Sequence, residues 1–438
     1  MVNMDTRDQP IHISSLSNEL FLHIFESDLT PSAILQCMLC CKRWLSLASS
    51  VLYKHIVLRN GHMLSVWAQC PSDTYDFLIE TFTLVPIHFL YSRSIPVVRD
   101  TRQLRSTLEK LPSRLANMVN LQCLSVYSPS LIPDAFCIPL SLITSIVDHL
   151  PQNCVSLEID VRNMIDDTDP EAHICTSIRR VLPQLRYLRL RFPEVCPEAF
   201  GYGFDASQPT IIAAGFKPAE APRLEQCLIT VGYPGPPNIV WPIRLCEHPR
   251  VDIVPVLARY LQVFKSPQNA PRLQKLWMID ALPLGDDYNR TSESLVRRDV
   301  LADKSQAIPY GNMAERRTDS WFVRLPAEES SHDLVTTLIS VKGLVEGPAW
   351  VITSNGTRLP APEAYKKAHL TVSQPVMRNW KEWSIKEKMA PLLWVYEKKS
   401  GVKILDVAEG GLTDKCIPTF RIPEGWIIDD DGYLERSE

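Results

Sequence analysis

A six-residue pattern recurs six times between residues 79 and 278, and it limits what this chain can fold into more than any other feature. Each copy has apolar residues at its first, fourth and sixth positions, which is typical of a strand with one buried face. The copies begin, at intervals of 31 to 49 residues, at Ile79, Leu121, Cys154, Leu185, Leu224 and Leu273. Runs with helical apolar spacing lie between them, at residues 104–118, 140–150, 174–182 and 252–264. The alternation of strand and helix predicts a mixed α/β fold.

One strand and one helix per unit resembles the leucine-rich-repeat arrangement. The intervals exceed the usual length of such repeats, about 20–29 residues, so the resemblance is to an irregular form. It implies an irregular β/α solenoid over residues 59–284 that holds a target protein. Non-repetitive α/β structure over the same residues is the alternative.

The segment from Leu16 to Leu58 is unusually apolar. Of its 43 residues, 25 are apolar and six are charged. Ser17 can cap a first helix, and Glu19 suits the positive end of that helix. Thr30 followed by Pro31 predicts the start of a second helix. Three short helices have too little interior to bury so many large side chains, so some of them should face a partner or the next domain.

This segment resembles the F-box. The run from Leu16 to Phe25 matches the family's opening motif, with Ser17 where the family has proline, and Cys41-Lys42-Arg43-Trp44 matches its close. The resemblance implies a three-helix unit that binds a Skp-type adaptor and, through it, a cullin scaffold of the SCF type. The adaptor-binding residues it implies are Leu16, Glu19, Leu20, Ile24, Phe25, Leu35, Leu39, Cys41, Lys42, Arg43 and Trp44.

Composition shifts divide the chain further. We expect a flexible N-terminus at residues 1–13, the F-box at 14–58, the repeat region at 59–284 and a polar linker or long loop at 285–319, where 13 of 35 residues are charged. Residues 320–438 should form a small α+β segment of unknown role, because six of the ten tryptophans lie in it. There we expect a helix at 333–344 and a hairpin formed by 392–396 and 402–407.

Charge and hydropathy exclude several classes of protein. The net charge is −4, so no overall basic field favours nucleic acid or an anionic membrane. The N-terminus lacks the pattern of a secretory signal, and no apolar run is long enough to span a bilayer. The 12 cysteines are not spaced as in a disulfide scaffold, which predicts reduced thiols and a cytoplasmic or nuclear location.

We find no phosphate-binding loop, dinucleotide fingerprint, zinc-protease motif or nucleophile elbow in the sequence. We therefore predict no catalytic residue, no cofactor and no metal site.

Several other groups of residues are predicted to have structural roles. The Cys37-x-x-Cys40-Cys41 run is predicted to supply buried packing thiols. Solvated turns or faces are predicted at Asp166, Asp167, Asp169, Asp429, Asp430 and Asp431. Arg186, Arg189 and Arg191 are predicted to be solvated, with a ligand-facing surface as the alternative. Core packing is favoured over recognition for Trp380 and Trp383.

The predicted function is that of a non-enzymatic substrate receptor of an SCF-type ubiquitin ligase. A protein-interaction scaffold that carries an F-box but acts outside ubiquitination is the second hypothesis. A third is an enzyme within residues 321–438. The target protein is not identified by the sequence.

Overall fold

The computed structural model describes part of the chain: residues 13–27, 29–59, 61–70, 75–85, 105–128, 138–161, 164–165, 173–192, 195–205, 212–231, 253–283, 293–310, 322–326, 335–340, 350–353, 356–366, 377–379, 426–428 and 434–436. Within these residues, every helix is too short or too polar to cross a bilayer.

The N-terminal unit consists of η1 (Ile13–Ser15), α1 (Asn18–Ser27), α2 (Pro31–Met38) and α3 (Lys42–Leu52). Both predicted helix starts are confirmed. The Ser17 hydroxyl accepts a hydrogen bond from the Leu20 amide at 3.4 Å, and the Thr30 hydroxyl accepts one from the Ala33 amide at 3.3 Å. The unit has its own small core, formed by Phe21, Phe25, Ile34 and Ala48.

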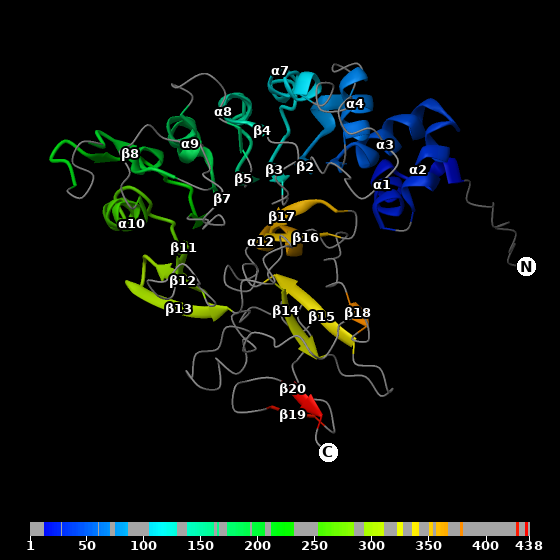
Figure 1. Cartoon of the computed structure of the whole chain (residues 1–438). Coiled ribbons are helices and arrows are strands. Elements are labelled where there is room, and N and C mark those ends of the chain that lie inside the picture. Colours follow the sequence, from blue (N-terminus) through cyan, green and yellow to red (C-terminus); the bar gives the residue numbers. More distant parts are fainter. Residues whose placement is uncertain are drawn as a thin grey trace, which may run out of the picture.

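Seven parallel strands follow one another across a curved sheet in the order of the chain (Figure 1). They are β1 (His55–Leu58), β2 (Thr81–Leu84), β3 (Cys123–Ser128), β5 (Ser156–Val161), β7 (Tyr187–Arg191), β10 (Gln226–Thr230) and β11 (Lys275–Pro283). Each of the six predicted strand positions overlaps one of the strands from β2 to β11. The periodic apolar pattern therefore located these strands correctly.

The helices between the strands lie along the outer side of this curve (Figure 1). They are α4 (Gly61–Gln69), α7 (Leu111–Leu115), α8 (Leu140–Asp148), α9 (Ile174–Val181) and α10 (Ile253–Phe264). The strand register aligns Leu124, Leu157 and Leu188 in one apolar row, which packs with helix residues such as Ile143 and Ile178 in a single core. Short elements complete this region: η2 (Asp76–Leu78), η4 (Leu182–Gln184), η5 (Pro197–Ala199), β4 (Ile138–Pro139), β6 (Met164–Ile165), β8 (Gly201–Tyr202) and β9 (Lys217–Pro218).

Two antiparallel strands extend the sheet beyond β11. These are β12 (Glu293–Asp299) and β13 (Lys304–Tyr310), so the sheet is mixed and nine-stranded. The expectation of a linker or loop over 285–319 is wrong for these residues. Charged residues lie in a strand when a neighbouring side chain accommodates them, and the guanidinium of Arg297 on β12 lies 4.5 Å from the centre of the Trp277 ring. High charge was therefore a poor sign of a loop here.

The C-terminal region contains small antiparallel sheets. One is formed by β14 (Phe322–Pro326), β15 (Val335–Ser340) and β18 (Met377–Asn379), and two are pairs: β16 (Trp350–Ile352) with β17 (Arg358–Pro360), and β19 (Trp426–Ile428) with β20 (Leu434–Arg436). A short helix, α12 (Ala361–Lys366), follows β17. The helix predicted at 333–344 is wrong, because β15 lies there and its VTTLIS sequence is rich in β-branched residues. The hairpin predicted at 392–407 lies outside the described residues.

Candidate functional site

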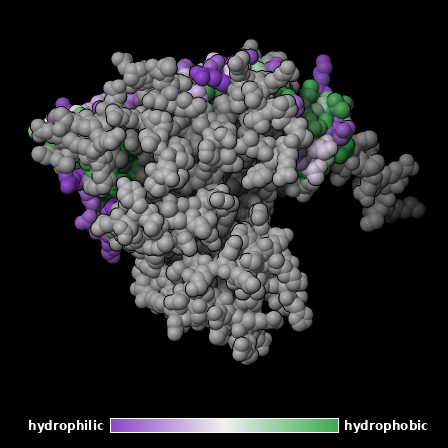
Figure 2. Space-filling model, viewed as in Figure 1, coloured by the Kyte–Doolittle hydropathy of each residue, from purple (hydrophilic) through white to green (hydrophobic). Residues whose placement is uncertain are grey.

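Four leucines of the N-terminal unit are exposed although they are large and apolar. The exposed fraction is 50% for Leu20, 49% for Leu35, 80% for Leu39 and 40% for Leu45. They lie on α1, in or just after α2, and on α3, and Figure 2 shows apolar side chains gathered at this end of the molecule. Exposed apolar surfaces of this kind are typical of sites that bind another protein.

The remaining apolar residues of the predicted adaptor site support this surface from within. Phe25 is buried in the core of the unit, and Leu16 and Ile24 are half-buried against that core. The Trp44 ring lies edge-on to Phe21 and Phe25, with ring centres 5.3 and 6.1 Å apart. The structure thus separates the predicted anchors into core residues and exposed ones. Leu45 is also exposed, but it was not among the predicted adaptor-binding residues. It directly follows Trp44 in the sequence and lies on the same helix, α3.

The polar residues of the predicted site are exposed, and one of them holds two helices together. The Arg43 guanidinium donates hydrogen bonds to Asn18 Oδ1 at 2.9 Å and to the Leu16 carbonyl at 2.6 Å, which ties the start of α3 to the start of α1. Glu19 and Lys42 lie exposed near these helix starts. The pKa of Glu19 is lowered by a hydrogen bond from its own backbone amide and by Ser17.

The cysteines of this unit differ from their prediction. Cys37 is half-buried against the small core, as a packing thiol should be. Cys40 and Cys41 are exposed, so the prediction of buried thiols is wrong for them. The reason is that α2 ends at Met38, and the turn before α3 carries both residues out of the helical apolar stripe.

Comparison with known families supports the assignment of this unit. A family model described as F-box-like matches residues 13–59. The chain therefore carries an F-box-like domain, and α1 to α3 are its helices. F-box domains typically bind Skp-type adaptors. No curated protein matches the chain.

The second candidate surface is the inner face of the curved sheet, opposite the helices. The strand register places Glu158 of β5 beside Arg189 of β7, and Asp160 beside Arg191. All four side chains are buried. Arg189 pairs with Glu158 and lies 3.4 Å from Asp160, and the Arg191 guanidinium is 2.8 Å from Asp160 Oδ2. The prediction that Arg189 and Arg191 are solvated is wrong, because acidic residues on the neighbouring strand neutralise them.

A segment from the C-terminal region covers this charged cluster. Figure 1 shows β16, β17 and α12 inside the curve of the sheet, below β3. Arg358 of β17 donates from Nε to Glu158 Oε2 at 2.6 Å, and its backbone amide donates to the Thr83 hydroxyl at 3.0 Å. Its guanidinium also lies 3.9 Å from the centre of the Tyr127 ring. The inner face is closed at these residues, so Arg189 and Arg191 do not form a ligand-facing surface.

The charges of this covered cluster depend on one another. Burial raises the pKa of Glu158, but the charges of Arg358 and Arg189 outweigh it and lower the pKa to about 2. Beside it, half-buried Arg186 pairs with Glu225 at 2.8 Å and with Glu363 of α12 at 3.2 Å. The expectation of a solvated Arg186 is therefore also wrong. The ion pairs of Arg358 with Glu158 and of Glu363 with Arg186 hold the C-terminal segment against the sheet.

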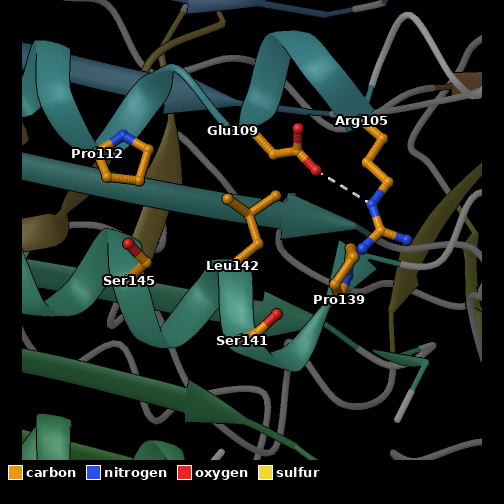
Figure 3. Close-up of a pocket in the computed structure, with 7 residues that line it drawn as sticks. All are labelled: Arg105, Glu109, Pro112, Pro139, Ser141, Leu142 and Ser145. Carbon is orange, nitrogen blue, oxygen red and sulfur yellow. Dashed lines mark hydrogen bonds and ion pairs between the residues drawn. The ribbon is translucent and has the colours of Figure 1, made fainter. Parts of the chain in front are cut away.

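A shallow hollow of about 210 Å³ lies on the outer side of the sheet, between α7 and α8 (Figure 3). Its lining is Arg105, Glu109, Pro112, Pro139, Ser141, Leu142 and Ser145. Arg105 and Glu109 pair with each other at 3.2 Å, so the hollow offers a ligand little net charge. The other predicted candidates, Asp166, Asp167, Asp169, Trp380, Trp383 and Asp429 to Asp431, lie outside the described residues.

Proposed function

We propose that this protein is the substrate-recognition subunit of an SCF-type ubiquitin ligase. The observation that carries the proposal is the exposed apolar surface formed by Leu20, Leu35, Leu39 and Leu45 on an F-box-like domain. Its helices would insert apolar side chains into a groove of a Skp-type adaptor, and the adaptor would connect the chain to a cullin.

In this role the chain itself carries out no chemistry. Ubiquitin transfer belongs to other subunits, and the chain acts by raising the effective concentration of the target near them. The leucine-rich-repeat-like region at 59–284 would hold the target, on surfaces other than the inner face that Arg358 covers. Such a protein works in the cytoplasm or the nucleus.

Binding to purified Skp-type adaptor tests the adaptor interface. Leu35→Asp with Leu39→Asp places two charges on the exposed surface and should abolish the complex without unfolding the unit, since neither residue is in its core. Val119→Asp is the matched control, because Val119 is also about half exposed but lies in the repeat region. If the double variant binds adaptor as tightly as the parent, the interface is wrongly placed.

Native co-purification separates the ligase from the scaffold hypothesis. A ligase subunit brings down adaptor and cullin together, and both should be lost in the double leucine variant. Adaptor without cullin would favour a scaffold that acts outside ubiquitination.

A further inference from the structure

A cluster of soft ligand atoms lies on the outer side of the sheet, where α9 begins. His173 is the residue before α9, Cys175 lies in its first turn, and Cys196 precedes the short helix η5. One imidazole nitrogen of His173 and the two sulfurs all lie within 4.8 Å of one another, and His173 Nε2 is 3.2 Å from Cys196 Sγ. The tertiary fold brings these three residues together, since 23 positions separate His173 from Cys196.

This spacing suits one metal ion. Zinc sits about 2.3 Å from sulfur and about 2.0 Å from nitrogen, so tetrahedral ligands lie about 3.5–3.8 Å from one another. The three atoms need only small movements to reach that geometry. Thiolate and imidazole are also the ligands that select zinc over magnesium or calcium.

Two surrounding hydrogen bonds are those expected around a metal-binding histidine and thiolate. His173 Nδ1 lies 3.3 Å from Glu198 Oε2, which would fix the ring so that Nε2 points to the sulfurs. The Cys196 amide donates to Cys175 Sγ at 3.4 Å. Binding would release one proton from each thiol, and Zn²⁺ with two thiolates is neutral, so the buried site carries no net charge.

We propose that His173 Nε2, Cys175 Sγ and Cys196 Sγ bind a zinc ion, with Glu198 positioning the histidine. Both cysteines are fully buried, whereas His173 and Glu198 are partly exposed, so the fourth coordination position opens toward them and takes a water molecule. The ion joins the start of α9 to η5 and stabilises this part of the repeat region. No short sequence motif contains these ligands, because the two cysteines lie on either side of β7.

The same residues have the order of a Cys–His–Glu triad, and burial decides between the two arrangements. A nucleophilic sulfur must be reached by its substrate, whereas Cys196 has no exposed surface. A small metal ion requires no such access once bound. We therefore assign the cluster to metal binding.

Zinc analysis of the purified full chain tests the proposal. We expect one equivalent of zinc in the parent and a loss of the bound zinc in His173→Gln, Cys175→Ala and Cys196→Ala, because each variant lacks one of the three ligands. Glu198→Gln should weaken binding without abolishing it. Cys227→Ala is the matched control, because Cys227 is equally buried but lies on β10, and it should keep the zinc.

Two measurements on the parent remain informative if the variants fail to fold. Replacement of zinc by cobalt should give the absorption of a tetrahedral site with thiolate charge transfer. Chelation should lower the Tm, because the ion joins the start of α9 to η5. The proposal is overturned if the parent takes up neither zinc nor cobalt, if all three ligand variants keep the metal, or if Cys196 is alkylated rapidly while zinc is bound.

Discussion

Arg358 and Glu158 form a bidentate ion pair across 200 positions of sequence. One lies in β17 of the C-terminal region and the other in β5, near the middle of the large sheet. Both side chains are buried, and Arg189 pairs with the same carboxylate. The inner face of the sheet is thus completed by a segment that follows it in the chain, and this segment supplies Glu158 with a second counter-charge beside Arg189.

Removal of Arg358 should destabilise the protein strongly. In Arg358→Ala the buried Glu158 keeps only Arg189 as a counter-charge, and we expect a loss of about 3 kcal/mol in the free energy of unfolding. Urea denaturation measures this change. The control is Arg180→Ala, which breaks a largely exposed pair with Asp148 and should cost less than about 1 kcal/mol. Equal losses in the two variants would contradict the role of the buried pair.

The same cluster should make the protein sensitive to acid. The folded state holds the pKa of Glu158 at about 2, below its ordinary value of 4.5, so the stabilisation is complete above pH 4.5 and is lost as the pH falls toward 2. The shift corresponds to about 3 kcal/mol. Unfolding free energies between pH 6 and pH 2.5 should fall steeply in the parent. Glu158→Gln should be less stable at pH 6 but show a shallower decline, and an unchanged slope would remove Glu158 as the cause.

Leu39 should be the strongest single contributor to adaptor binding, because it is the most exposed of the four leucines. Burial of a leucine contributes about 1.5–3 kcal/mol, so Leu39→Ala should weaken the adaptor complex about 10- to 100-fold. Isothermal titration calorimetry gives the affinity, and circular dichroism checks the fold. Val119→Ala should leave the affinity unchanged. Parent-like binding by Leu39→Ala would place the interface on another face of the unit.

The stability of the first turn of α2 should depend on the Thr30 side chain. Its hydroxyl satisfies the Ala33 amide, and Thr30→Ala removes that bond at a cost of about 1 kcal/mol. Hydrogen exchange of the α2 amides, read by mass spectrometry, should speed up severalfold. Thr30→Ser keeps a hydroxyl at the same place and should exchange like the parent. If the two variants behave alike, the cap is not what holds this helix end.

Local sequence patterns predicted the structure correctly where a residue's neighbours in sequence decide its environment. The apolar spacing located β2, β3, β5, β7, β10 and β11, and the caps at Ser17 and Thr30 located two helix starts. The pattern failed at β15, although the β-branched residues there favour a strand. It also failed at Arg189, because a charged residue on a strand is solvated or paired according to what lies beside it.

The sequence by itself determined the alternation of strands and helices and the F-box-like unit, since both follow from periodicity and short ordered motifs. Tertiary structure alone decided which leucines of that unit remain exposed, that Arg358 closes the inner face, and that a histidine meets two cysteines at the start of α9. Periodicity reports whether a residue faces inward or outward. It carries no information about which distant segment will pack against that residue, and that choice depends on the whole fold.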